Sequence, residues 1–164
     1  MQYYCFLVNE VNALSLPPLE DCLPHRGRML LIHRLTHADN ERASAEVDVR
    51  ADNLFNQKGG IPAWVGVEFM AQTVAAWAGA RAKISGGYPK LGFLLGTRRF
   101  ETTVQAFSLG KVLRVDVHCE LMADNGLGQF DCQITMDDTL VCWARISVFE
   151  PDDAEEVLGN RVQS

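Results

Sequence analysis

The clearest pattern in this chain is a strict alternation of apolar and polar residues in its second half. Between positions 112 and 122 every second side chain is apolar: Leu113, Val115, Val117, Cys119 and Leu121. The same alternation recurs over 130–136 and 140–148, with an Asp137-Asp138 turn between them, and earlier over 43–49. Successive side chains of a β-strand point to opposite faces. These segments, together with 91–104, are therefore predicted to be strands with one buried face.

A different pattern covers residues 62–84, where apolar residues follow one another almost without interruption. The segment is rich in alanine, begins with Pro62 and carries no basic residue before Arg81. Proline suits the first turn of a helix, and a helix that is apolar on all sides must be surrounded by other elements. We therefore predict one long buried helix. A short helical turn is expected before Pro24, and a strand at Met29–Ile32.

One long apolar helix followed by a run of antiparallel strands indicates an α+β fold. In it, a curved antiparallel sheet of five to six strands wraps around the central helix. The 164 residues fit a single domain, 1–164, with a core over roughly residues 20–150. We expect a short N-terminal extension and a frayed acidic tail from Asp152. No internal repeat or linker interrupts the chain.

The composition narrows the classes of function. The chain is 48% hydrophobic and 22% charged with a formal net charge of −6, which is typical of a globular protein. No nucleic-acid partner is expected, because the chain is acidic and has no basic stripe with interleaved aromatic residues. Residues 1–16 lack the basic start of a signal peptide, and no run of ~18 apolar residues predicts a membrane span. We therefore expect a cytoplasmic protein without a membrane partner.

The cysteines predict neither a disulfide framework nor a metal site. They are five in number and form no C-x-x-C pair: Cys5, Cys22, Cys119, Cys132 and Cys142. We expect reduced, mostly buried thiols whose role is packing rather than nucleophilic attack. No metal ion and no cofactor is predicted.

Glu68 is the strongest candidate for a catalytic residue. It is the only acidic residue of the predicted helix and is surrounded by apolar neighbours. Burying a carboxylate is costly unless it is protonated or hydrogen-bonded. The usual consequence of burial is a raised pKa, which suits general acid or base chemistry near neutral pH. Gln72 follows one helical turn later, where its amide can hydrogen-bond and orient Glu68. The alternative is that this helix face simply meets solvent or a subunit interface.

The approach to the helix supplies candidate substrate-binding residues. Gly60 lets the backbone come close to a ligand, and Pro62 starts the helix so that the N–H groups of Ala63 and Trp64 are expected to be free. Such amides can receive a thioester carbonyl and stabilise an enolate. Phe55 and Trp64 would tolerate a long, flat or aromatic acyl group, although both also suit an ordinary core.

Histidine is the other residue expected in such chemistry. The chain has four histidines, at His25, His33, His37 and His118, and none lies in the loop just before the helix. His118 falls on the polar face of a strand and is expected at the surface. His25 is predicted to brace the first helical turn, with an accessory role in the active site as the alternative.

Two stretches resemble a known family. Leu23-Pro24-His25-Arg26, followed by the apolar run 29–32 and His33-Arg34, is similar to the opening of β-hydroxyacyl-acyl-carrier-protein dehydratases. Residues 62–72 are similar to the family's P-G-V-x-x-x-E-x-x-A-Q helix motif, with four positions in register: Pro62, Glu68, Ala71 and Gln72. Arg98-Arg99-Phe100 and Gly110–Leu113 resemble two later segments. Within the family, Pro62–Gly66 most resembles the dehydratase-like subunit of aryl polyene biosynthesis clusters.

The resemblance implies a hot-dog fold assembled as a dimer. It also implies a hydro-lyase that removes water from a 3-hydroxyacyl group carried by acyl carrier protein, in fatty acid or polyketide biosynthesis. One position departs from the family pattern, because Leu54 stands where the catalytic histidine belongs. In the family each active site takes its histidine from one chain and its acid from the other. The resemblance therefore implies a subunit that contributes Glu68 to a site shared with a related hot-dog partner.

Two other functions remain open from the sequence. A hot-dog thioesterase can use a lone helix carboxylate on an acyl-carrier or coenzyme A thioester, and it would release a free acid instead of water. A non-catalytic acyl-binding or scaffold subunit would be insensitive to the loss of Glu68. The acyl chain, its carrier, and the choice between a homodimer and a heterodimer also stay open. An acidic carrier protein would need local arginines to dock, such as Arg98 and Arg99.

Overall fold

The computed structural model describes residues 16–151. The expectations for the N-terminal start, for Cys5 and for the acidic tail from Asp152 lie outside these residues. Six strands form one antiparallel sheet with the order β1 (Arg34–Ala38), β2 (Arg42–Asp48), β6 (Val112–Met122), β7 (Leu127–Met136), β8 (Thr139–Phe149) and β4 (Phe93–Thr102). Two short strands, β3 (Gly60–Pro62) and β5 (Ala106–Ser108), pair separately.

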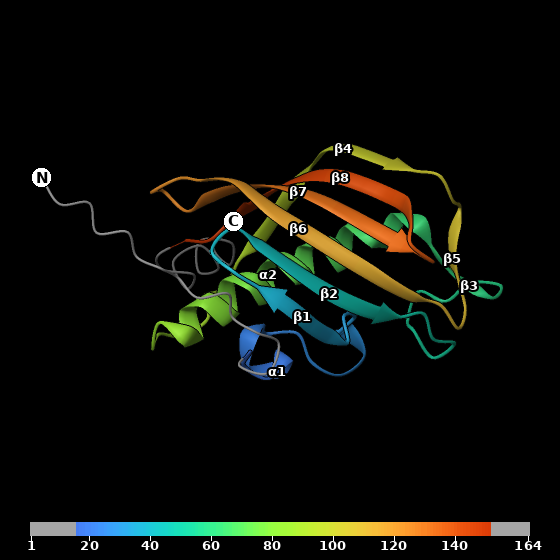
Figure 1. Cartoon of the computed structure of the whole chain (residues 1–164), viewed down its shortest axis with the longest axis horizontal. Helices are drawn as coiled ribbons and strands as arrows, with labels where there is room; N and C mark the ends of the chain where they lie inside the picture. Colours follow the sequence, from blue (N-terminus) through green and yellow to red (C-terminus); the bar gives the residue numbers. More distant parts are fainter. Residues whose placement is uncertain (1–15, 152–164) are drawn as a thin grey trace, which may run out of the picture.

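The long helix α2 (Gly66–Ile84) lies across the inner face of the sheet, which curves around it (Figure 1). A single 3-10 turn over Ala63–Val65 leads into it from Pro62, as the proline predicts. The largest buried side chains join the helix to the strands. Trp77 contacts Phe130 edge to face at 5.3 Å, and Phe69 lies 6.0 Å from Phe107. The predicted wrapped helix is confirmed.

The alternating segments form strands as predicted. In β2 the side chains of Ala43, Ala45 and Val47 are buried against the helix, while the residues between them face outward. Ala45 is paired with Val115 of β6, and Val115 with Ile134 of β7, so the apolar positions of neighbouring strands share the inner face. This register follows from the period of two, because a shift by one residue would turn the apolar side chains into solvent.

The first helical turn is found where Pro24 predicts it. Helix α1 (Leu19–Cys22) ends before an extended Leu23 and lies against α2 (Figure 1). The close approach of α1 to α2 depends on Gly79 of α2, because a Cβ atom there would lie only 1.7 Å from the carbonyl oxygen of Cys22. Gly79 therefore sets how closely the two helices pack.

The predicted strand at Met29–Ile32 is wrong. A 3-10 turn covers Gly27–Met29, and the first strand begins only at Arg34. Leu31 and Ile32 are both buried, and the N–H of Leu31 donates to the side chain of Gln72 (2.9 Å) instead of to a neighbouring strand. The apolar run thus reflects burial of an extended segment that a side chain holds in place.

A long helix inside a curved six-stranded antiparallel sheet is the hot-dog architecture.

Candidate functional site

Glu68 lies in the first turn of α2 and is held by one neighbour from the same helix. The Nε2 of Gln72 donates to its Oε1 at 2.9 Å, so the predicted hydrogen bond is present. Within residues 16–151, no hydrogen bond reaches the other carboxylate oxygen, Oε2. The catalytic role of both residues stays a prediction.

Gln72 is completely buried and uses its whole amide group. Besides donating to Glu68, its Nε2 donates to the carbonyl oxygen of Met29 at 2.8 Å, and its Oε1 accepts from the N–H of Leu31 at 2.9 Å. A buried amide with these partners can hold only one orientation. The loop before β1 therefore fixes Gln72, and Gln72 in turn fixes one oxygen of Glu68.

His25 lies beside the same carboxylate. Its Nε2 is 3.7 Å from the Oε1 of Glu68, and its Nδ1 is buried without a hydrogen-bond partner among the described residues. The guanidinium of Arg26 holds the backbone at this point, because its Nη1 donates to the carbonyl oxygens of Leu23 (2.6 Å) and His25 (2.7 Å). The accessory role in the active site, which was the alternative for His25, stays a prediction.

The burial of Glu68 is only partial, between the expected buried carboxylate and the alternative of a helix face that meets solvent. Its side chain is 35% exposed. The physical reason is that the sheet covers most of α2 but leaves one strip of the helix half-buried, along Glu68, Ala71, Ala75 and Ala78. Sequence alone shows an apolar helix on all sides and does not reveal which strip the sheet leaves uncovered.

This strip forms one wall of a cavity of about 230 Å³. Glu68 and His25 line one end of the cavity, and the rest of its wall is largely apolar, including Val74, Phe93, Leu94, Phe130 and Val148. Cys22 also lines it, but burial raises the pKa of this thiol to about 11, with the charge of Asp21 acting in the same direction. A thiol with that pKa is protonated near neutral pH, so Cys22 is a packing residue.

The other predicted substrate-binding residues do not line this cavity: Phe55, Gly60, Pro62, Ala63 and Trp64. Trp64 is 58% exposed, and its ring contacts that of Phe55 at 5.8 Å, so the pair forms a separate aromatic patch at the start of the helix. Their role in substrate binding stays a prediction.

One backbone expectation in this region is wrong. The N–H of Ala63 is not free, because it donates to the carbonyl oxygen of Gln105 at 2.9 Å. Gly60 lies close to protein backbone, since a Cβ atom there would be 2.8 Å from the carbonyl oxygen of Phe107, and its role in substrate binding stays a prediction. Pairing of β3 with β5 explains both contacts. In the described part of the chain, the N–H of Trp64 makes no backbone hydrogen bond outside its own helical turn.

Leu54 lies on the turn that precedes β3 and is 40% exposed. It does not line the cavity beside Glu68. In this chain, therefore, the position that the family resemblance assigns to a histidine is partly exposed and lies outside the cavity that Glu68 lines. The substitution of a catalytic histidine at this position stays a prediction.

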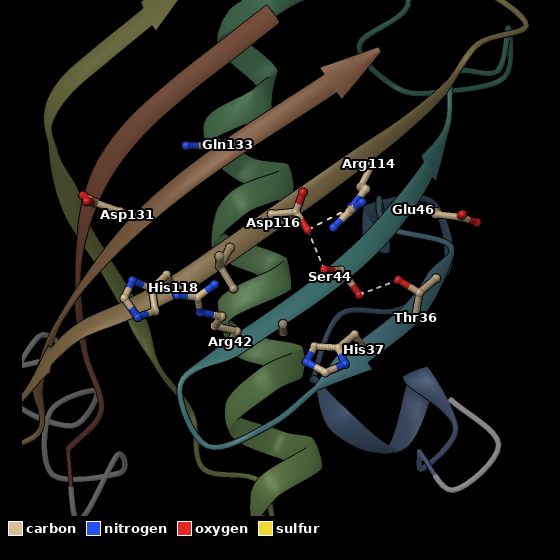
Figure 2. Close-up of a pocket in the computed structure, with 12 residues that line it drawn as sticks. Thr36, His37, Arg42, Ser44, Glu46, Arg114, Asp116, His118, Asp131 and Gln133 are labelled. Atoms are coloured by element: carbon tan, nitrogen blue, oxygen red, sulfur yellow. Dashed lines mark hydrogen bonds and ion pairs between the residues drawn. The ribbon is translucent and has the colours of Figure 1, made fainter. Parts of the chain in front are cut away.

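A larger hollow, of about 770 Å³, lies on the outer face of the sheet (Figure 2). The polar side chains that line it largely form hydrogen bonds with one another: Ser44 donates to Asp116, and Arg114 donates to the same carboxylate at 3.0 Å. Glu68 is not among its lining residues. We read it as the solvated polar face of the strands. Among residues 16–151, no three His, Cys, Asp or Glu side chains gather where they could hold a metal ion.

The fold and the placement of the carboxylate define the class of protein, a hot-dog protein with a helix carboxylate beside a largely apolar cavity. The family model "ApeP-like: ApeP dehydratase" matches residues 17–159. The chain therefore belongs to the ApeP-like dehydratase family, and its function is dehydratase-like. No match was found among curated protein sequences.

Solved structures agree with this assignment. The dehydratase heterocomplex ApeI:P from Xenorhabdus doucetiae is similar with a TM-score of 0.82 and 28% identity, over 90% of this chain and 99% of that chain. A hypothetical thioesterase from Streptococcus pneumoniae with coenzyme A has a TM-score of 0.56 and 15% identity, over 71% of this chain and 84% of that chain. This second likeness shows the fold alone. No helix in the described part of this chain is long and apolar enough to cross a membrane.

Proposed function

We propose that this chain is the acid-bearing subunit of a 3-hydroxyacyl-carrier-protein dehydratase whose active site is completed by a related hot-dog subunit. The proposal rests on the position of Glu68 at the end of an apolar cavity and on its hydrogen bond with Gln72. Gln72 holds one carboxylate oxygen at 2.9 Å, which leaves the other oxygen for the substrate. His25 is an accessory residue that borders the same oxygen and limits the rotation of the carboxylate.

The chemistry needs two groups acting on neighbouring carbons. A base removes the proton from the carbon next to the thioester carbonyl, and an acid delivers a proton to the hydroxyl group on the next carbon. The carbon–oxygen bond breaks, a carbon–carbon double bond forms, and water leaves. Glu68 is suited to the acid step, and a histidine from the partner to the base step. Trp64 N–H is a candidate donor to the thioester carbonyl.

The partner is expected to pair with the edge of the sheet. Among the described strands, β4 is an edge strand of ten residues that is bonded only to β8, and it exposes Leu94 and Leu95. A long apolar edge strand is a template for pairing with another chain. The opposite edge, β1, has five residues and carries Arg34, which is engaged in ion pairs with Glu46 and Asp48. The similar structure of a dehydratase heterocomplex supports a partner that is not a second copy.

An acidic carrier protein is the proposed source of the acyl group. Arg98 and Arg99 are exposed on β4 and border a shallow hollow with Arg145. The guanidinium of Arg99 lies 5.2 Å from the ring of Trp143 and also pairs with Glu101, which keeps it extended on the surface. Clustered arginines on an otherwise acidic protein favour approach of an acidic partner. The cytoplasmic location expected from the sequence belongs to the same proposal.

The test is a dehydration assay with 3-hydroxyacyl-carrier protein, followed by mass spectrometry for loss of water. It compares this chain alone, the neighbouring hot-dog subunit alone, and their mixture. Activity is expected only in the mixture. Glu68→Gln should lower it at least about a hundredfold, because general acid catalysis contributes about 10²–10⁴-fold. Glu120→Gln, which removes an acid from the outer face of β6, should leave the rate unchanged.

Three outcomes would contradict the proposal. Full activity of this chain alone would mean that no partner completes the site. Activity that survives Glu68→Gln in the mixture would identify the chain as a scaffold. Release of a free acid, without loss of water, would assign a thioesterase activity.

A further inference from the structure

A histidine side chain fastens the start of the first strand to β2. Strand β1 begins at Arg34, whose pairing with Glu46 is the first of its ladder with β2. One residue earlier, the N–H of His33 donates to the carbonyl oxygen of Glu46 at 2.8 Å. The ring of His33 adds a second bond, because its Nδ1 accepts from the N–H of Asp48 at 3.1 Å. The imidazole therefore satisfies a backbone N–H of β2 at the point where the chain before His33 leaves the sheet.

The segment that leaves the sheet is the one that holds Gln72. The carbonyl oxygen of Met29 and the N–H of Leu31 bind the amide group of Gln72 at 2.8 Å and 2.9 Å. Gln72 in turn donates to the Oε1 of Glu68 at 2.9 Å. Leu31 is only two residues from His33. A displacement of the segment at His33 is therefore transmitted to the carboxylate through two consecutive hydrogen bonds.

The bond to the N–H of Asp48 requires a neutral ring, because Nδ1 accepts a hydrogen bond only while it carries no proton. Burial lowers the pKa of His33 below its usual value, although the charge of Asp48 acts in the opposite direction. The guanidinium groups of Arg34 and Arg50 act in the same direction as burial, and the carboxylate of Asp52 opposes them. The structure thus favours the form of the ring that can accept.

The carboxylates near the ring are already engaged by arginines. Asp48 accepts from the Nη1 and Nη2 of Arg34 at 3.1 Å and 2.6 Å, and Asp52 lies 3.2 Å from the Nε of Arg50. Charged side chains face the ring from β1, from β2, from the loop after β2 and from the turn before β1: Arg34, Asp48, Arg50, Asp52 and Arg28. Among these described residues, neither carboxylate is left to pair with a protonated imidazole.

We propose that His33 is a positioning residue for the dehydration, because its neutral ring fastens the segment that orients Gln72 and Glu68. This inference rests on the proposed function of Glu68. Protonation of the ring turns Nδ1 into a donor that faces the N–H of Asp48, so the bond breaks and the segment 29–33 is released. A histidine whose pKa is lower in the folded than in the unfolded chain stabilises the fold fully above about pH 6.5. This contribution is lost as the pH falls through the lower pKa of the folded state.

The first test follows the N–H of Leu31, which reports the position of the segment directly. Its protection, the ratio of the intrinsic to the measured rate of deuterium exchange, is compared in the full chain at about pH 7.5 and about pH 5.0. The protection is expected to fall at least about fivefold at the lower pH, because a pKa that is lower by one unit changes the equilibrium about tenfold. His33→Asn keeps an acceptor oxygen near the place of Nδ1 and does not titrate, so its protection should change less than about twofold. His37→Asn, which removes a histidine paired with Asp39 elsewhere on β1, should behave as the unsubstituted chain.

The second test measures dehydration by the two-subunit mixture over the same range. The ratio of kcat/KM for His33→Asn to that of the unsubstituted mixture cancels the titration of Glu68 and of the partner's groups. It should stay within about twofold of one at about pH 7.5 and rise at least about fivefold at about pH 5.0. His33→Phe fills the space of the ring without an acceptor. It should lower kcat at least about tenfold at both pH values, since the carboxylate loses its orientation, and change KM less than about twofold.

Three results would overturn the inference. One is a protection of Leu31 that does not depend on pH in the unsubstituted chain. Another is an equal loss of that protection in His33→Asn, and the third is full activity of His33→Phe. If His33→Phe does not fold, the comparison with His33→Asn decides. A mixture that dehydrates no substrate would refute the proposed function instead, and the exchange of Leu31 would still show whether the ring fastens the segment.

Discussion

Gln72 connects three parts of the molecule through a single amide group. It joins α2 to the backbone of Met29 and Leu31 and also to the carboxylate of Glu68. Its spacing from Glu68 predicts the last contact, because residues four apart lie on one helix face. Its contacts with Leu31 and Met29, which lie 41 and 43 residues away, depend on the tertiary fold and explain why the apolar run at 29–32 is not a strand.

Replacing Gln72 by Met should distinguish the hydrogen bonds of this side chain from its packing. The methionine keeps the length of the side chain but leaves the buried N–H of Leu31 without an acceptor, which costs about 1–3 kcal/mol. The free energy of unfolding, measured by urea titration, should fall by that amount, and dehydration by the two-subunit mixture should slow. Gln133→Met, on the exposed outer face of β7, is the matched control. Equal stability of the two variants would contradict the assigned role.

The packing of α1 on α2 is the contact between elements that brings His25 to Glu68. It depends on Gly79, since a Cβ there would overlap the carbonyl oxygen of Cys22. In the sequence, Gly79 appears only as a residue of low helix propensity within an alanine-rich helix. The structure gives the reason for it, because α1 leads directly into the turn that carries His25.

Gly79→Ala should therefore push α1 away from α2. The overlap is with backbone and cannot be relieved by a side-chain rotation, so we expect a loss of about 1–3 kcal/mol in the free energy of unfolding. The buried Cys22 thiol should become accessible, and its alkylation, followed by mass spectrometry, should accelerate. Gly92→Ala, where the nearest heavy atom is 3.9 Å from the added Cβ, is the control. Unchanged stability and an unreactive Cys22 would refute this account.

Across the part of the molecule that the structure describes, the sheet has two open edges and the helix has one half-buried strip. Edge β4 and the exposed side chains of Leu54, Trp64 and Leu95 belong to the surface of these residues. Apolar side chains at an open sheet edge favour association. The proposed partner subunit provides a physical reason for their exposure.

Leu95→Lys should weaken the association with the partner. A lysine at an edge strand opposes pairing because its charge must be desolvated. Sedimentation of the mixture should show mainly free subunits, and dehydration should fall in parallel while this chain stays folded. Leu140→Lys, at an exposed position on β8 away from the edge, should leave the complex intact. A stable complex with Leu95→Lys would assign the partner to another surface.

The sequence by itself determined the strands β2, β4, β6, β7 and β8, the wrapped helix and the Glu68–Gln72 pair, but it placed the first strand at 29–32 instead of Arg34–Ala38. These features follow from local periodicity, since a period of two or of 3.6 residues assigns side chains to faces whatever the rest of the chain does. It also indicated the family, through motifs that lie close together along the chain. The sequence did not predict the short strands β3 and β5, because three residues are too few to show an alternation of apolar and polar positions.

Only the tertiary structure decided how the site is assembled. It put His25 beside Glu68, used the Ala63 amide in a strand pairing, and separated Phe55 and Trp64 from the cavity. It also decided which strip of α2 the sheet leaves uncovered. These outcomes depend on contacts between residues far apart in the chain, and the spacing within one segment carries no information about the distance to another.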